Sequence, residues 1–414
     1  MNDLGPRAIS ALGFFVLLGI AWLTSTDRAR IDRQTIVWGV LLQVGLACIL
    51  LVSPLREIFF PGIELVVSLL IDWSRAGASF LFGPLLDVGP SFALSVLPII
   101  IFMGSLFGVL YHLGWIQPIV RVMARVLSRT MHISGVEGLA AGANIFVGMI
   151  ESGIVIRPYL ATMTRSELFS FMTLGMSTIA GSVLVTYVSI LGGGPFAGHL
   201  VVASLISAPA ALVVAKIMLP EIETPQTLDD SSDEPIEPER ATTTNLIDAA
   251  AEGGLVGMRL ALNIGALLIA FVALIAMANT FVGALGGLFG VPELTLQAIL
   301  GVVLAPLAFL MGVPWAEAQE VGSLIGIKTI LNEFIAYQQL AEAIADGAVS
   351  ERSAVIAAYA LCGFANFGSL AILLGGIQAI APERRPECAE LGLRSILAGT
   401  LATCMTGCLA GMIV

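Results

Sequence analysis

The chain has 414 residues, a mean hydropathy of +0.96 and a formal net charge of −11, and 12% of its residues are charged. Soluble domains carry about 25% charged residues, so this composition excludes an ordinary soluble protein and indicates an all-α polytopic membrane protein. Residues 221–240 hold eight carboxylates against Arg240, so the remainder is nearly neutral and no nucleic-acid partner is indicated.

Continuous apolar segments of about 20 residues, the length that a helix needs to cross a bilayer, predict eight transmembrane helices. They cover residues 8–25, 34–53, 92–113, 166–191, 197–218, 258–284, 353–378 and 391–413. Residues 62–83 are not predicted to span, because they include Asp72 and Arg75. Arg28 and Arg30 follow the first helix, and positive residues mark the cytoplasmic side. We therefore expect an uncleaved first helix with its N-terminus outside.

The segments between these helices divide the chain into five predicted regions. N-terminal scaffold helices come first, together with interfacial amphipathic helices such as 115–130, whose arginines recur every four residues. Two later regions each hold a hairpin and a broken helix, and an acidic, disordered cytoplasmic loop separates the first of them from an interfacial helix and a long scaffold helix. In order, the regions are 1–132, 133–218, 219–244, 245–295 and 296–414.

Two glycine-interrupted segments, 133–164 and 296–346, are too polar for contact with lipid. Each is predicted to fold as a re-entrant hairpin of two half-helices, with breaks at GMIESG (148–153) and GVPWAEA (312–318). Both are followed by a Ser-Glu pair, a polar interruption and a Gly-Gly pair at similar spacing. This weak duplication predicts two hairpins arranged as an inverted repeat, the pattern that points to a transporter's site at the membrane midplane.

The two hairpins each contain a carboxylate, Glu151 and Glu333. Ionisable residues inside membrane segments are costly and are functional by default. Both are therefore candidate ligand-binding groups. For Glu151, a local ion pair with Arg157 is the alternative.

Neutral polar residues supply the rest of a candidate site. Asn366 and Ser369, in CGFANFGS, can donate and accept hydrogen bonds and suit recognition of hydroxyl groups; hydrogen bonding between helices is the alternative. Asn144 and Thr178, with free carbonyls of broken helices, offer ligands for a hard cation such as Na+. Phe364 offers an aromatic face for a ring, although packing explains it equally well.

Groups typical of catalysis are absent from the sequence. The three histidines lack metal-ligand spacing, the five cysteines form no CxxC pair, and there is neither a G-x-S-x-G motif nor a Walker A lysine. The sequence therefore disfavours an enzyme or an ATP-driven pump, and it predicts no cofactor other than a coupling ion.

Longer motifs resemble the concentrative nucleoside transporter family. They are RPYLATMTRSELFSFMTLGMSTIAGSVLVTYVSILGG (157–193), GIKTILNEFIAYQQL (326–340) and YALCGFANFGSLAILLGG (359–376). The resemblance covers essentially the whole chain. It implies a homotrimer in which each protomer has eight spanning helices, three interfacial helices and two re-entrant hairpins, and moves a transport domain past a static scaffold.

The resemblance implies a site for the sugar. At the matching positions, Glu333, Asn366 and Ser369 hold the ribose hydroxyls, and Phe364 lies beside the sugar. This half of the family's substrate site is intact here.

The resemblance also implies a cation site. Its ligands are the side chains of Asn144 and Thr178 and the carbonyls of Val147 and Ile179. Because family members that run on protons tend to lack the asparagine, Asn144 favours Na+ over H+.

The first hairpin tip departs from the family pattern, which reads Gly-Gln-Ser/Thr-Glu-Ala/Asn. Here the tip is Gly-Met-Ile-Glu-Ser-Gly, and only Glu151 survives among the groups that read the nucleobase. Met149 and Ile150 cannot make amide and hydroxyl hydrogen bonds, so the base half of the pocket is predicted to be rebuilt. Either it is more apolar and favours another base, a modified nucleoside or broad selectivity, or the substrate is not a standard nucleoside.

The sequence as a whole predicts a multi-pass protein of a bacterial-type inner membrane that imports nucleosides together with a cation, with Na+ as the favoured ion. The alternatives are a symporter of another ribose-containing or small polar solute, a proton-coupled nucleoside symporter, and a nucleoside sensor. A sensor would be expected to carry a signalling domain, and the acidic loop is too short to form one.

Overall fold

The computed structural model describes residues 4–87, 92–227, 243–288, 290–291 and 293–414, and within them all regular structure is helical. The first half contains α1 (Leu4–Leu23), α2 (Arg33–Leu51), α3 (Arg56–Phe82), α4 (Phe92–Ser95), α5 (Leu97–His112), α6 (Ile116–Met131), α7 (Gly135–Val147), α8 (Met149–Val155), α9 (Arg157–Leu160), α10 (Arg165–Ser177), α11 (Gly181–Ile190) and α12 (Phe196–Met218). The second half contains α13 (Leu246–Leu288), α14 (Leu296–Leu310), α15 (Trp315–Ile330), α16 (Glu333–Ala345), α17 (Glu351–Leu361), α18 (Phe367–Ile380) and α19 (Arg385–Ile413).

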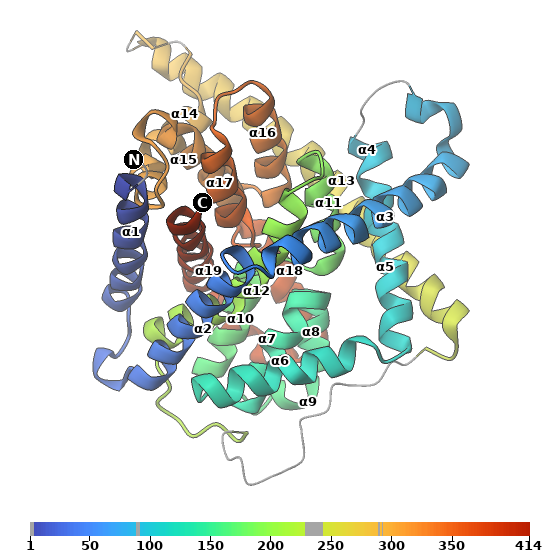
Figure 1. Cartoon of the computed structure of the whole chain (residues 1–414), viewed down its shortest axis with the longest axis vertical. Coiled ribbons are helices and arrows are strands. Elements are labelled where there is room, and N and C mark those ends of the chain that lie inside the picture. Colours follow the sequence, from blue (N-terminus) through green and yellow to red (C-terminus); the bar gives the residue numbers. More distant parts are fainter. Residues whose placement is uncertain (1–3, 88–91, 228–242, 289, 292) are drawn as a thin grey trace.

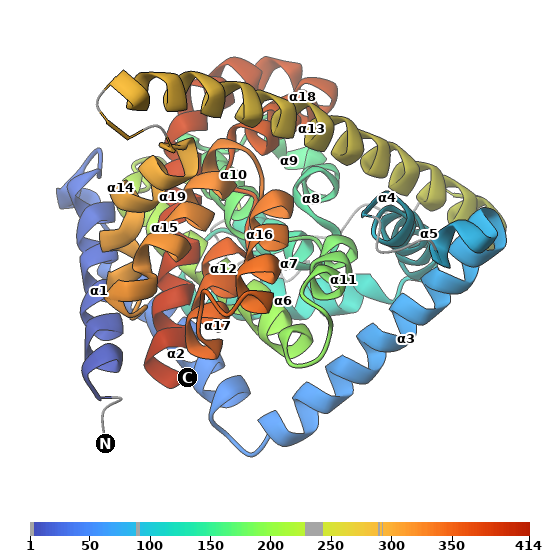
Figure 2. The same cartoon turned by 90° about the horizontal axis from the view of Figure 1, so that it is seen from above.

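Helices α3, α5 and α13 form an outer frame along two sides of the molecule (Figure 2). Most side chains of α3 and α13 are exposed, whereas α10 is buried over almost its whole length. Helices α5 and α13 cross through facing glycines: a Cβ at Gly104 would lie 2.6 Å from the carbonyl oxygen of Gly253, and one at Gly257 would lie 2.7 Å from that of Ile100. Small residues at this four-residue spacing let membrane helices pack closely.

The predicted fold class is confirmed. Among the described residues, eight helices are long and apolar enough to cross a membrane. The set differs from the predicted one in two places. Helix α3 is a single helix of 27 residues, and Asp72 and Arg75, on which the sequence excluded a span, are both exposed on it. Residues 353–378 instead divide into α17 and α18, because Asn366 starts a new helix by accepting a hydrogen bond from the backbone N–H of Ser369.

Inside the frame, broken helices occur in the same order in both halves of the chain (Figure 1). In the first half, Gly148 separates α7 from α8, and residues 178–180 separate α10 from α11. In the second half, residues 331–332 separate α15 from α16, and residues 362–366 separate α17 from α18. The predicted break at GMIESG is confirmed, because Gly148 adopts a φ of +100°, which favours glycine.

The predicted break of the second hairpin is wrong in position. At residues 311–314 the chain turns by 114° between two complete helices, α14 and α15. Gly312, with a φ of +96°, and Pro314 form that turn, so their signal marks a helix connection. The break inside the hairpin is marked by Asn332, whose side chain caps α16 by accepting from the backbone N–H of Ile335.

The two halves keep a constant spacing of 184 positions. A Cβ at Gly138 of α7 would lie 2.7 Å from the carbonyl oxygen of Ala124 on α6; one at Gly322 of α15, 184 positions later, would lie 2.8 Å from the backbone nitrogen of Ala305 on α14. Each hairpin therefore packs its first half-helix on the preceding helix through an equivalent glycine. The same interval separates Gly142 and Gly326, Gly148 and Asn332, and Ser166 and Ser350.

The base of the first hairpin is fixed by polar contacts. Helices α7 and α10 both begin with capping boxes, in which Ser134 and Thr164 bond to glutamates three residues later. The Nζ atom of Lys216, from α12, lies 2.7 Å from Oε1 of Glu137 and donates to Oγ of Ser166 at 3.0 Å. Buried pairs of this kind hold their partners in one geometry, so the hairpin projects from a fixed base towards Gly148.

The acidic loop at 219–244 falls mostly on residues 228–242, which lie outside the described residues. Helix α13 is continuous from Leu246 to Leu288 and covers what the sequence divides into an interfacial helix and a scaffold helix.

Candidate functional site

A cavity of about 800 Å³, part of it open to the surroundings, lies where four helix breaks meet. Residues at the N-terminal ends of α8, α11, α16 and α18 line it, so the positive ends of four helix dipoles surround it. Helix α13 closes one side with four apolar residues: Leu260, Ile264, Leu267 and Phe271.

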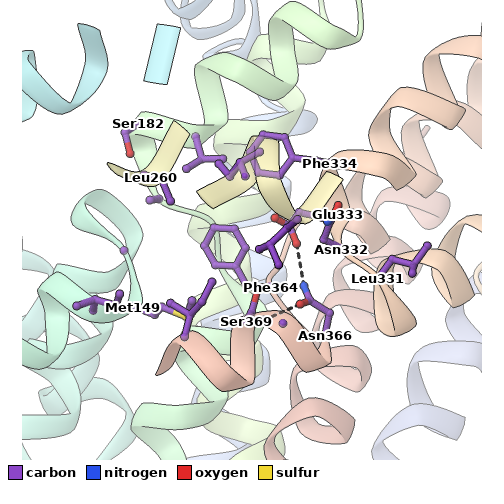
Figure 3. Close-up of a pocket in the computed structure, with 18 of the residues that line it drawn as sticks. Met149, Ser182, Leu260, Leu331, Asn332, Glu333, Phe334, Phe364, Asn366 and Ser369 are labelled. Atoms are coloured by element: carbon purple, nitrogen blue, oxygen red, sulfur yellow. Dashed lines mark hydrogen bonds between the residues drawn. The ribbon is translucent and has the colours of Figure 1, made fainter. Parts of the chain in front are cut away.

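Glu333 is the central polar group of this cavity and is 3% exposed. Its Oε1 accepts a hydrogen bond from the hydroxyl of Tyr187 at 2.8 Å, and its Oε2 accepts one from Nδ2 of Asn366 at 2.9 Å. Oδ1 of Asn366 accepts in turn from the backbone N–H of Ser369 at 2.7 Å (Figure 3). A carboxylate can accept about four hydrogen bonds, so Glu333 is held in place with acceptor capacity left for a ligand.

Tyr187 is held by its own ring contacts. Its ring stacks on Tyr337 with centroids 4.6 Å apart and meets Phe334 edge-on at 4.8 Å. The hydroxyl of Tyr337 donates to the carbonyl of Ala358 at 2.8 Å. Helices α11, α16 and α17 are thereby joined behind the Glu333 carboxylate, which limits its movement.

Phe364 borders the cavity, and its ring lies between Met149 and Glu333 in Figure 3. It therefore stands between the polar side of the cavity and the first hairpin tip. Phe367, the other aromatic residue of this motif, is 51% exposed and lies outside the set of lining residues.

The first hairpin tip brings Met149, Ile150 and Glu151 to the opposite side of the cavity. The two apolar side chains rest on glycines: a Cβ at Gly175 would lie 3.0 Å from Cβ of Met149, and one at Gly376 would lie 3.5 Å from the Ile150 side chain. The tip is thus seated on α10 and α18 by apolar packing rather than by hydrogen bonds.

Glu151 is the one ionisable group at this tip. Within the part of the chain that the structure describes, no ion pair joins it to Arg157, so the alternative of a local salt bridge is not seen. Its carboxylate lines the cavity and can accept hydrogen bonds from donors on a ligand.

The candidate cation ligands lie behind this tip. Asn144 and Thr178 are buried, and Nδ2 of Asn144 donates to Oγ1 of Thr178 at 2.5 Å. The hydroxyl of Ser152, fully buried, donates to Oδ1 of Asn144 at 3.3 Å. Val147 lines the cavity, and the carbonyl of Ile179 accepts from Oγ of Ser204 at 3.5 Å. Amide, hydroxyl and carbonyl oxygens at the C-terminal ends of α7 and α10 are a donor set that fits a hard cation.

The structure thus places all seven predicted substrate-site residues around one cavity and brings Asn144 and Thr178 together beside it. Their roles stay predictions. The sequence did not point to Tyr187, Ser152 or the wall from α13. Ser182, which also lines the cavity, stands 184 positions before Asn366, so a complete comparison of the two halves would have found it.

Known proteins resemble this chain over its whole length. Residues 12–85 and 199–411 match family models described as the N-terminus and the C-terminus of Na+ dependent nucleoside transporters, and residues 93–194 match one described as nucleoside recognition. The uncharacterized transporter YutK of Bacillus subtilis is 47% identical over 405 residues, which cover 97% of this chain and 98% of that protein.

Two further comparisons concern a permease and a solved structure. The nucleoside permease NupC of Helicobacter pylori is 38% identical over 416 residues, which cover 98% of this chain and 97% of the permease. The structure of CNTnw in an inward-facing substrate-bound state is 41% identical and superposes with a TM-score of 0.92, over 99% of this chain and 98% of that one.

Proposed function

This chain belongs to the concentrative nucleoside transporter family, and from that premise we propose that it imports nucleosides together with Na+ across a bacterial inner membrane. The family consists of multi-pass membrane transporters and not of enzymes. The observation that carries the proposal is the pair formed by Glu333 and Asn366, which join the facing ends of α16 and α18 inside the cavity.

The proposed sugar site is this pair together with Ser369. Two neighbouring hydroxyls of a ribose ring would each donate to the free acceptor capacity of Glu333 and accept from Asn366 or the N-terminal N–H groups of α18. Hydrogen bonds to a charged, buried and oriented carboxylate contribute about 1.5–3 kcal/mol each. A site that relies on such hydrogen bonds discriminates strongly against substrate analogues that lack the hydroxyls. An apolar pocket discriminates much less between substrates of different size.

The proposed base site lies between Phe364 and the first hairpin tip. Met149 and Ile150 give it an apolar floor, and Glu151 is its acceptor. A base would be held by contact area and by its own N–H donors, rather than by the amide and hydroxyl pair of the usual family motif. The second candidate, a symporter of a different ribose-containing solute, is favoured by this same apolar tip.

The proposed cation site couples to the substrate through the hairpin. A cation held by Asn144, Thr178 and the carbonyls of Val147 and Ile179 would join the end of α7 to the break after α10. Val147 and the adjacent Met149 line the cavity, so cation binding would fix one of its walls. A cation that raises substrate affinity in this way is itself bound more tightly when substrate is present, by linkage.

The proposed assembly is a homotrimer in the lipid bilayer. The outer frame leaves large apolar side chains exposed on α3 and α13, such as Phe80 and Ile269. Such a surface requires lipid or protein contact. The inner broken helices would move past this frame during transport.

The first test is uptake of labelled uridine and adenosine into proteoliposomes containing the purified full chain, with an inward Na+ gradient and then an inward H+ gradient. We expect saturable uptake that follows the Na+ gradient. Uptake driven by H+ alone would show that protons, not Na+, are the coupling ion. Failure to take up either nucleoside would show that the substrate is another solute.

A double substitution tests the base site. Met149→Gln/Ile150→Thr keeps the length of the side chain at 149, shortens the one at 150 by a methyl group, and adds an amide and a hydroxyl at the tip. Because each new hydrogen bond is worth about 0.5–1.5 kcal/mol, we expect the uptake ratio of adenosine to purine riboside, which lacks the exocyclic amine, to rise roughly 2- to 10-fold. The matched control is Met277→Gln/Ile269→Thr on the exposed face of α13. An unchanged ratio in the first variant would mean that the base does not contact the tip.

A further inference from the structure

Lys328 of α15 is a buried cation with neutral ligands. It is 0% exposed, and its Nζ donates to the carbonyl of Ala360 at 2.8 Å and to Oγ1 of Thr403 at 3.0 Å. None of the ion pairs in the described residues includes it. A charged group inside a membrane protein is expensive to keep, and the hydrogen bonds of this one go to Ala360 and Thr403 rather than to the proposed sugar and base sites.

The position of Lys328 has a counterpart in the first half of the chain. Lys328 stands 184 positions after Asn144, the interval that also relates the packed glycines of the two hairpins and their breaks. Asn144 lies four residues before the break at Gly148, and Lys328 lies four residues before Asn332. The residue that replaces Asn144 in the second half is therefore an ammonium group.

The contacts of the two side chains correspond as well. Asn144 reaches the C-terminal end of α10 at Thr178, and Lys328 reaches the C-terminal end of α17 at Ala360. Lys328 also donates to a hydroxyl group of the helix that closes its half, Thr403 of α19.

The second candidate cation ligand of the first half, Thr178, also has a counterpart that binds Na+ poorly. The position 184 residues after Thr178 is Cys362, the residue that caps the end of α17. A thiol is a soft ligand and a poor one for Na+, whereas a hydroxyl oxygen is a hard one. Both hard side-chain ligands of the first half are thus absent from the second, and a covalently attached positive charge contacts the carbonyl of Ala360 and the hydroxyl of Thr403 instead.

We propose that the ammonium of Lys328 is a tethered cation that fills, in the second half of the chain, the place that the coupling cation takes in the first. The free carbonyls at the C-terminal ends of both broken helices carry partial negative charge and bind a positive group. In the second half, the Lys328 ammonium neutralises this partial charge permanently. In the first half, it is neutralised only when the coupling cation is bound. Each transport cycle therefore carries one cation per substrate. This proposal rests on the proposed function.

The experiment measures coupling in proteoliposomes of the full chain. Initial nucleoside uptake is recorded against Na+ concentration, and the ratio of radioactive Na+ to nucleoside taken up is determined. For the unaltered chain we expect a Hill coefficient of about 1 and one Na+ per nucleoside. In Lys328→Asn/Cys362→Thr, which rebuilds the ligands of the first half, we expect the Hill coefficient to approach about 2 and the flux ratio to double.

Two further variants separate this role from a structural one. Lys328→Arg/Cys362→Thr keeps the charge and is expected to keep the ratio of the unaltered chain. Lys328→Met/Cys362→Thr supplies no charge and only one of the two side-chain ligands, the hydroxyl introduced at position 362, and is expected to lose most uptake without changing the Hill coefficient. Folding of each variant is checked by size-exclusion chromatography and thermal unfolding.

Three results would overturn the proposal. The first is a flux ratio of two in the unaltered chain, a measurement that needs no variant to fold. The second is a folded Lys328→Asn/Cys362→Thr variant that transports with an unchanged flux ratio. The third is a folded Lys328→Asn/Cys362→Thr variant whose nucleoside uptake is not restored at any Na+ concentration. Complete absence of cation-dependent uptake by the unaltered chain would instead overturn the proposed function, and the tethered cation with it.

Discussion

Glu333→Gln is expected to reduce nucleoside uptake by roughly 30- to 5,000-fold. The substitution keeps the shape of the side chain but removes the charge that Tyr187 and Asn366 hydrogen-bond. Removing one partner of a buried, hydrogen-bonded charged contact costs about 2–5 kcal/mol, which converts to that range of affinity. The amide would also present an N–H group to one of two donors, so one hydrogen bond becomes a repulsive contact.

The measurement is Na+-driven uptake of the substrate identified in the first assay, with KM and the maximal rate determined separately. The matched control is Glu342→Gln, on the exposed side of the same helix, which is expected to transport normally. If uptake by Glu333→Gln stayed within a few-fold of that of the unaltered chain, Glu333 would not be part of the proposed sugar site.

Asn144→Leu is expected to abolish the stimulation of uptake by Na+. Coupling between two sites is typically worth about 5- to 150-fold in affinity, and this substitution removes the amide that bonds to both Thr178 and Ser152. Because leucine is close to asparagine in size and the site is buried, the hairpin keeps its packing while the proposed cation site loses a ligand. Residual uptake should then be the same with and without a Na+ gradient.

The check is uptake at a fixed nucleoside concentration over a range of Na+ concentrations, with K+ or choline as replacement. Asn263→Leu makes the same chemical change at an exposed position of α13 and is expected to leave Na+ stimulation intact. If Asn144→Leu retained the stimulation, the cation site would have to lie elsewhere.

Much of the fold could be predicted from the sequence because apolar length and polar interruptions are local signals. The apolar segments located seven of the eight described helices that are long enough to span, and Gly148 located the first hairpin break, since few other residues adopt its backbone conformation. The second hairpin break was misplaced because Gly312 and Pro314 give a stronger local turn signal than Asn332. An asparagine that caps a helix looks, in sequence, like any polar residue.

The candidate site was predictable to the extent that its residues are unusual for a membrane. Carboxylates and asparagines in apolar segments stand out, so Glu333, Asn366 and Asn144 were found. Tyr187 was not, because a tyrosine in an apolar helix is ordinary, and its role depends on which atom lies 2.8 Å from its hydroxyl. Lys328 carried a signal, as a basic residue within the hairpin segment 296–346, but its meaning depends on the spatial correspondence of the two halves.

The apolar side of the cavity formed by α13 affects the energy of the proposed movement of the inner broken helices past the outer frame. The hydrogen-bonding side chains of the described lining, such as Glu151, Glu333 and Asn366, come from the inner broken helices, whereas the four residues from α13 are apolar. Apolar contact is non-directional and changes gradually with area, so a bound molecule can slide along this surface without breaking a directional bond at each step. In the proposed movement past the outer frame, this apolar wall would oppose sliding only weakly, and the hydrogen bonds to the substrate would move together with it.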